Sequence, residues 1–165
     1  MADTTDLDPY EATVADLIQR DMCPPPLTVT EDKPLLQMAQ EMLARPEVHT
    51  TAVVDADGLM VGIIISRTLA EHFFVEEFPE VVFGEVLDLR SSLDAVRVGQ
   101  RFHSASEMMD DAVAVRPDDS LHDAFVLIHA THATGLPVVD ATGRPVAYLD
   151  LMTLALLHGE DARTD

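Results

Sequence analysis

Two stretches of the chain share one pattern of apolar and polar positions. Residues 51–64, TAVVDADGLMVGII, and residues 136–149, LPVVDATGRPVAYL, each pass from an apolar run through an Asp and a Gly to a second apolar run. The two copies start 85 residues apart. Short apolar runs on either side of such a turn are typical of paired strands. We therefore predict a strand, a tight turn and a second strand in each copy.

A second repeated pattern precedes each strand pair. Residues 30–43, TEDKPLLQMAQEML, align with residues 116–129, RPDDSLHDAFVLIH, at an offset of 86. In both segments apolar residues recur every three or four positions, which is the spacing of one buried helix face. The pattern predicts a helix in each.

A third match lies further upstream. Residues 14–22, VADLIQRDM, resemble residues 104–112, SASEMMDDA, with a surplus of about five residues near Cys23 in the first copy. Each half then contains a short helix, a short strand, a helix, a strand pair and a helix. A half of this size cannot cover both faces of its sheet, so we expect an α+β fold whose two pseudo-symmetric units pack around a shared axis.

These patterns divide the chain into five parts. The divisions are an acidic N-terminal tail at residues 1–13, a first unit at 14–70, a connector at 71–103, a second unit at 104–158 and a tail at 159–165. The connector is rich in Phe, Val and Leu at amphipathic spacing, so we expect it to be helical, with a break near Pro79.

The charge balance excludes one class of partner. The chain has 30 acidic against 10 basic residues and a net charge of −20, which repels nucleic acid. Such acidity suits a salt-rich cytoplasm, and it is also an ordinary route to solubility.

Cysteine content and apolar run lengths indicate a compartment. The single Cys23 cannot form an internal disulfide or a multi-cysteine metal site. The apolar runs are too short to span a bilayer, and the acidic start does not resemble a signal peptide. We expect a cytoplasmic protein without membrane contact.

The sequence offers little for catalysis or metal binding. It lacks a Gly-rich phosphate loop, a Gly-x-Ser-x-Gly turn and a His-Glu-x-x-His motif, and Cys23 has no neighbouring base. His129 and His132 are close enough in a helix to share an ion, but His122 is two turns from His129, and no third ligand lies nearby. We predict no catalytic and no metal site, and no required cofactor.

The repeated motifs resemble those of the tandem CBS domain, the regulatory module named after cystathionine beta-synthase. The resemblance covers about residues 14–158. The second copy carries EMM (107–109), VRPDDSL (115–121), TGLPVVDATG (134–143) and PVAYL (145–149), and the first carries ADLI (15–18), VTEDKPL (29–35), TAVVDADG (51–58) and MVGIII (60–65). The resemblance implies two βαββα units, frequently assembled as a homodimer, that bind adenosine-containing ligands in the clefts between the copies.

The family pattern also implies positions for the ligand. Members that bind nucleotides hold the ribose with a Ser or Thr and, three residues later, an Asp. Here the pairs are Ile65 with Thr68 and Asp150 with Thr153, so both copies have Thr in place of the Asp. Each change removes a charge-assisted hydrogen bond, which costs about 1 to 2 kcal/mol. Asp150 is a carboxylate that either contacts the ribose or repels a phosphate, and it makes the second cleft the better candidate.

The resemblance places the cleft walls at the start of the strand pairs. The complete set of expected ligand-binding residues is Val48, His49, Thr68, Thr134, Gly135, Leu136, Pro137, Asp150 and Thr153. Arg67 and Arg116 are candidates for phosphate contacts, although the pattern favours solvated surface arginines that offset nearby acidic residues.

Two functions follow from these observations. The first is a non-catalytic regulatory module that senses AMP, ADP, ATP or S-adenosylmethionine and signals to an effector protein whose identity the sequence does not specify. The second is a ligand-independent dimerisation module with degenerate nucleotide sites. In both we expect a homodimer.

Overall fold

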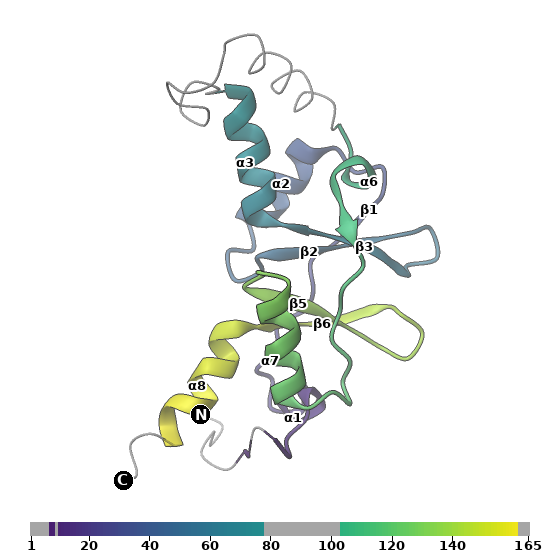
Figure 1. Cartoon of the computed structure of the whole chain (residues 1–165). Coiled ribbons are helices and arrows are strands. Elements are labelled where there is room, and N and C mark those ends of the chain that lie inside the picture. Colours follow the sequence, from purple (N-terminus) through teal and green to yellow (C-terminus); the bar gives the residue numbers. More distant parts are fainter. Residues whose placement is uncertain (1–6, 9, 78–102, 162–165) are drawn as a thin grey trace.

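Two halves of mixed helix and strand are stacked on each other (Figure 1) in the computed structural model, which describes residues 7, 8, 10–77 and 103–161. The first half contains α1 (Val14–Gln19), β1 (Thr28–Thr30), α2 (Leu35–Leu43), β2 (Thr50–Val54), β3 (Met60–Ile65) and α3 (Ser66–Glu77). The second contains α6 (Ala105–Met108), β4 (Asp110–Asp111), α7 (Leu121–Ala130), β5 (Gly135–Val139), β6 (Pro145–Asp150) and α8 (Leu151–Asp161). The predicted α+β fold and its internal repeat are confirmed.

Sheet pairing follows the repeat with one difference. In the first half β1 pairs in parallel with β2, and β2 pairs antiparallel with β3. In the second half β5 and β6 pair antiparallel, while the counterpart of β1 is reduced to one parallel bridge between Val115 and Val138. Of the connector predicted at 71–103, α3 covers the beginning, and residues 78–102 lie outside the described residues.

In each strand pair, a turn of the same kind joins the two strands, as predicted. Asp55 accepts hydrogen bonds from the backbone N–H groups of Asp57 and Leu59, at 2.9 Å each, and Asp140 binds its own turn in the same way. Gly58 and Gly143 complete the turns with φ of 80° and 88°, a conformation that favours glycine. The shared Asp and Gly therefore have a structural role.

The N-terminal segments of the two halves are exchanged. Although α1 belongs to the first half in sequence, it lies beside α7 of the second (Figure 1). There the Val14 N–H donates to the Asp119 carbonyl oxygen at 3.0 Å, and the Ala15 N–H donates to that of Pro117 at 2.8 Å.

The first residues of the second half make the matching contact with the first half. The Ala105 N–H donates to the Lys33 carbonyl oxygen at 2.9 Å, and the Ser106 N–H to that of Glu31 at 2.8 Å. β4 also pairs with β3. Each half thus contributes its first helix to the other, and the halves are related by the expected pseudo-twofold arrangement.

These hydrogen bonds correct one alignment. Thr13 pairs with Ser120 as Ser104 pairs with Pro34, so Thr13 corresponds to Ser104. The sequence alignment, which placed Val14 opposite Ser104, is one residue out. Each segment contains hardly more than one helical turn, so its side-chain pattern is too short to define the register of the alignment. The backbone pairing defines that register.

Among the described residues, the hydrophobic core forms two clusters that cross between the halves. Val14 and Leu17 of α1 are fully buried with α7, β5, β6 and α8, and Ile63 of β3 joins that cluster. Conversely, Tyr148 of β6 is buried against α2, β2 and α3. No helix in the described part of the chain is long and apolar enough to span a membrane.

Candidate functional site

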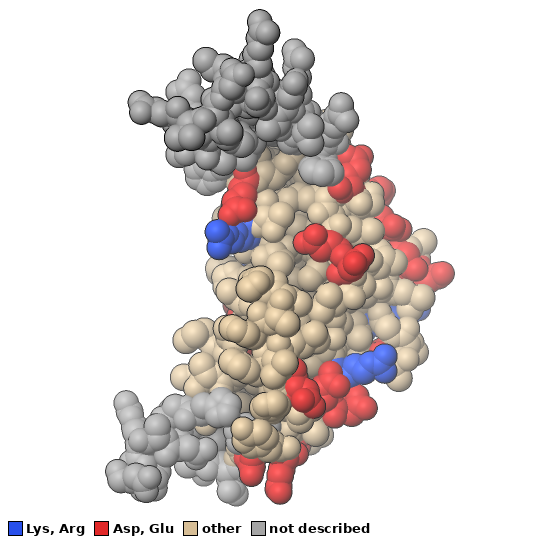
Figure 2. All heavy atoms as spheres, in the orientation of Figure 1, with Lys and Arg blue, Asp and Glu red and all other residues tan. Residues whose placement is uncertain are grey.

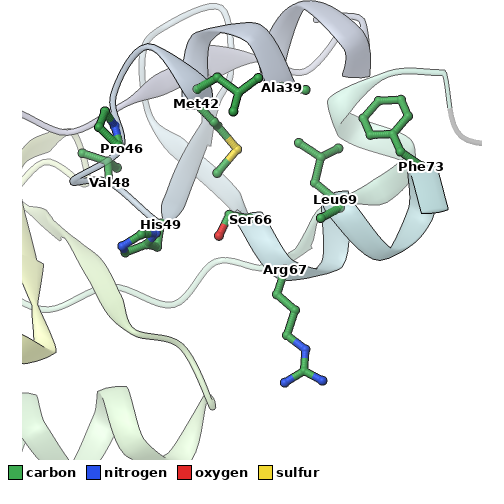
Figure 3. Close-up of a pocket in the computed structure, with 11 residues that line it drawn as sticks. Ala39, Met42, Pro46, Val48, His49, Ser66, Arg67, Leu69 and Phe73 are labelled. Atoms are coloured by element: carbon green, nitrogen blue, oxygen red, sulfur yellow. The ribbon is translucent and has the colours of Figure 1, made fainter.

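A cavity of about 510 Å³ opens between α2, the start of β2 and the start of α3. Val48 and His49, two of the predicted ligand residues, line it. The other lining residues are Ala39, Met42, Leu43, Pro46, Ser66, Arg67, Leu69, Ala70 and Phe73. Figure 3 shows an apolar end between the two helices, with Ala39 and Phe73, and an opposite end with His49.

The polar groups gather at one end of the cavity. His49 is exposed, and Ser66 is half-buried at the first position of α3. Arg67 is the one charged residue among the described lining residues, but its side chain points away from the cavity (Figure 3). Its Nε lies 2.8 Å from Glu71 Oε1, and the side chain is 86% exposed. The cavity therefore offers apolar walls and a polar mouth.

Backbone hydrogen bonds fix this mouth from both halves of the molecule. The Ser66 N–H donates to the His49 carbonyl oxygen at 2.8 Å, which ties the start of α3 to the start of β2. The His49 N–H donates to the Tyr148 hydroxyl of β6 at 3.2 Å. Burial is the largest cause that raises the pKa of Tyr148, so this hydroxyl stays protonated at neutral pH. The second half thus positions the cavity of the first.

Gly135, a predicted wall residue, lies where the two halves meet. The Thr50 hydroxyl donates to its carbonyl oxygen at 2.8 Å, so β2 and β5 are joined there. A side chain at Gly135 would collide with the Tyr148 hydroxyl and come within 2.6 Å of the Leu149 carbonyl oxygen. Glycine is therefore required for Tyr148 to reach His49.

Other predicted residues of the second half lie apart from the cavity. Leu136 and Pro137 are buried in β5, and Thr134 is exposed. The Leu151 N–H donates to the Thr134 carbonyl oxygen at 2.8 Å. This bond is the counterpart of the one between Ser66 and His49, so the second half repeats the backbone of the site.

Asp150, the most distinctive of the predicted ribose residues, has a structural role. Its Oδ1 accepts a hydrogen bond from the Met152 N–H at 2.7 Å and thereby caps α8. Thr153 is half-buried in the first turn of α8, Thr68 is exposed on α3, and neither lines the cavity. The sequence reasoning did not predict the cap.

Several lining residues were missed from the sequence. Ser66 stands between the two family ribose positions, and its place directly after the last strand was the available signal. Met42, Leu69 and Phe73 fall on apolar helix faces, so periodicity identifies them only as core residues. Nothing in a single helix pattern shows that a cavity separates two helices.

The second candidate arginine lies among acidic groups. Arg116 lines a smaller cavity of about 300 Å³ together with Asp118 and Asp140. Its backbone N–H donates to Asp119 at 2.8 Å. Carboxylates at this opening disfavour an anionic group there.

The described residues contain no group of three His, Cys, Asp or Glu side chains that could hold a metal ion. The His122 ring stacks on Tyr10, with centroids 5.1 Å apart, and the His129 ring stacks on Phe125 at 6.1 Å. These two imidazoles are engaged with aromatic rings.

Comparisons with known proteins agree with this architecture. The sequence pattern of the CBS domain matches residues 14–74 and 105–155. A CBS domain-containing protein from Thermotoga maritima has a TM-score of 0.72 and 25% identity, over 94% of this chain and 99% of that one.

Two ligand-bound structures share the fold. CBSX2, a CBS-pair protein of Arabidopsis thaliana solved in complex with AMP, gives a TM-score of 0.62 and 21% identity over 92% of this chain and 98% of its own. The CBS domain pair of MJ0100, solved with 5′-methylthioadenosine and S-adenosyl-L-methionine, gives 0.64 and 18% over 91% and 98%. The chain has no match among curated protein sequences.

Proposed function

The chain belongs to the CBS domain family, and on this basis we propose that it is a non-catalytic regulatory module that binds an adenosine-containing ligand. The ligand class comprises AMP, ADP, ATP and S-adenosylmethionine. Ligand binding changes how the two halves sit against each other, and the change is passed to an effector protein. We propose that the module acts as a homodimer.

The cavity beside His49 is the observation that carries this proposal. Its volume of about 510 Å³ falls in the range of roughly 300 to 1,000 Å³ that is typical of small-molecule sites. The walls formed by Met42 and Leu69 suit a purine ring, while His49 and Ser66 provide donors and acceptors for a ribose. The complexes of related CBS pairs with AMP and with S-adenosyl-L-methionine support this ligand class.

We place the ligand at the mouth of this first-half cavity. The predicted residues of the second half belong to a second, pseudo-equivalent cleft, with Thr134 in the place of His49. Because Tyr148 supports the first mouth and the counterpart of Tyr148 is Ile63, which has no hydroxyl, the first is the better organised of the two.

Thermal melting of two matched variants tests the proposal. The wild-type protein is melted with and without millimolar AMP, ATP and S-adenosylmethionine. A ligand at about a hundredfold its dissociation constant stabilises the native state by about 2.7 kcal/mol, a shift of several degrees for a chain of this size. His49→Ala should abolish the shift, whereas Thr134→Ala should retain it.

Loss of the shift in Thr134→Ala but not in His49→Ala would move the ligand to the second cleft. If none of the three compounds shifts the melting temperature of the wild type, that result contradicts ligand sensing. His49 is exposed and its backbone hydrogen bond does not depend on the side chain, so His49→Ala should melt near the wild-type temperature without ligand.

One observation favours the alternative, a dimerisation module without a ligand. Both family carboxylate positions are Thr, and the carboxylate of Asp150 is already bound to the Met152 N–H. In that case the oligomeric state measured by light scattering is unchanged by nucleotides, and none of the three compounds shifts the melting temperature.

A further inference from the structure

The two halves differ at the residue that ends the second strand of each pair. Ile65 ends β3 and Asp150 ends β6, at matching positions 85 residues apart. Each stands directly before a helix, α3 in the first half and α8 in the second. The second half therefore has a carboxylate where the first half has an aliphatic side chain.

Asp150 lies at the junction of the two halves. Its partner in the sheet register is Gly135, whose carbonyl oxygen accepts the Thr50 hydroxyl of the first half. The N–H of the next residue, Leu151, donates to the Thr134 carbonyl oxygen at 2.8 Å. Because Thr134 and Gly135 are predicted wall residues of the second cleft, Asp150 borders that cleft.

One hydrogen bond holds the carboxylate in place. Asp150 Oδ1 accepts the Met152 N–H at 2.7 Å, and the start of a helix favours a negatively charged group. Alternation along β6 puts Asp150 on the same face of the strand as Tyr148, which packs against the first half. The carboxylate is therefore fixed beside the cleft instead of turning freely into solvent.

The equivalent place in the first half carries no charge. Ile65 packs against the apolar cluster of the second half, and the two residues that follow it, Ser66 and Arg67, line the cavity. Ile65 cannot accept the Arg67 N–H, which is the counterpart of the Met152 N–H. The first cavity therefore lacks the carboxylate that borders the second cleft.

We propose that Asp150 closes the second cleft to phosphorylated nucleotides, so that each chain binds one such nucleotide, in the first-half cavity beside His49. A fixed carboxylate repels a phosphate group. The surrounding charge adds to this repulsion, because acidic side chains exceed basic ones both in the chain and on the face shown in Figure 2. The inference rests on the proposed function, since it assigns the proposed ligand to one of two clefts by charge.

The number of nucleotides bound per chain tests the inference. In isothermal titration calorimetry the wild type should bind one AMP per chain, whereas Asp150→Ser should bind two, because removal of the carboxylate strengthens binding in the second cleft by about tenfold or more. Serine copies the cap of α7, in which Ser120 accepts the Asp123 N–H at 3.1 Å, so the variant removes the charge and keeps the helix start. Adenosine, which has no phosphate, should bind to both proteins alike.

The reciprocal variant moves the carboxylate to the first half. Ile65→Asp should weaken AMP binding in the first cavity by about tenfold or more, while Ile65→Ser, which also removes the aliphatic side chain, should not. The double variant of Ile65→Asp and Asp150→Ser should again bind one AMP per chain, with an affinity that now depends on Thr134 instead of His49. Asp57→Asn removes one acidic charge from the exposed hairpin turn of the first half and should leave the wild-type stoichiometry unchanged.

The possible outcomes separate this inference from the proposed function. Two AMP per wild-type chain, or one AMP per chain in a folded Asp150→Ser, would overturn the inference and leave the proposed function intact. An equal gain for adenosine would also overturn it, because the carboxylate would then fill space instead of repelling charge.

A wild type that binds neither AMP, ATP nor S-adenosylmethionine would contradict the proposed function and this inference with it. Circular dichroism shows which variants are folded. If Ile65→Asp is unfolded, the stoichiometry of Asp150→Ser decides the question by itself.

Discussion

At the scale of single residues, two adjacent threonines of β2 differ in what their hydroxyls do. The Thr50 hydroxyl donates to Gly135 across the two halves, at 2.8 Å. The Thr51 hydroxyl is fully buried and has no hydrogen-bond partner within the described structure. A buried hydroxyl without a partner retains the cost of its desolvation.

Valine at these two positions should therefore have opposite effects. Thr51→Val removes the unpaired hydroxyl at nearly constant volume and should raise the free energy of unfolding by about 1 kcal/mol. Thr50→Val breaks the hydrogen bond to Gly135 and should lower it by about 1 kcal/mol. Urea denaturation of both variants measures the difference, and a destabilised Thr51→Val would show that its hydroxyl has a partner.

Cys23 should be a poor nucleophile. Burial raises the pKa of its thiol from 9.0 to about 11, which corresponds to a thiolate fraction about a hundredfold smaller at neutral pH. Alkylation by iodoacetamide at pH 8, followed by mass spectrometry, should be much slower in the native protein than in urea. Equal rates would contradict the burial.

The same pKa predicts how stability depends on pH. Because the native thiol holds its proton more tightly than the unfolded one, the stabilising contribution is complete below about pH 9 and is lost as the pH rises through about 11. The melting temperature of Cys23→Ala should therefore fall less than that of the wild type between these two pH values.

At the scale of elements, helix α8 is capped by a carboxylate at a position where the family pattern has a ribose-binding Ser or Thr. Asp150 accepts the Met152 N–H at 2.7 Å, while Ser120 caps α7 by accepting the Asp123 N–H at 3.1 Å. Asp150→Ala should lower the free energy of unfolding by about 1 kcal/mol. Asp150→Ser, which copies the cap of α7, should restore most of it in urea denaturation.

The cap also changes how a binding experiment at Asp150 is interpreted. A ligand response that is lost in Asp150→Ala but kept in Asp150→Ser reflects the start of α8, whereas loss in both variants indicates that the carboxylate itself contacts the ligand. An unchanged stability of Asp150→Ala would mean that the capping hydrogen bond contributes nothing.

At the scale of the whole molecule, the acidic charge opposes the folded state. A net charge of −20 on 165 residues produces self-repulsion that the few described ion pairs, such as Arg45 with Glu47, do not balance. Raising sodium chloride from about 0.05 M to about 1 M shortens the screening length from over 10 Å to about 3 Å. The melting temperature should rise by several degrees.

Potassium chloride should act like sodium chloride if screening is the cause. The proposed homodimer should also tighten over the same salt range, because repulsion between the copies is screened. A melting temperature that is flat or falls with salt would show that the acidic groups are too far apart to destabilise the native state.

The sequence alone determined the parts that rest on local pattern. The repeated Asp and Gly predicted both hairpin turns, the periodicity at 30–43 and 116–129 predicted α2 and α7, and their common order predicted two similar halves and the family resemblance. These features depend on residues close together in the chain, where side-chain spacing directly reflects strand or helix geometry.

Tertiary structure decided what depends on residues far apart. The exchange of α1 and α6 follows from backbone hydrogen bonds, to which every residue type contributes alike, so no side-chain pattern specifies it. Of the ligand residues expected from the sequence, Val48 and His49 line the cavity, whereas Asp150 caps a helix. Ala39 and Phe73 stand on separate helices, and only the packing of α2 against α3 places both at one cavity.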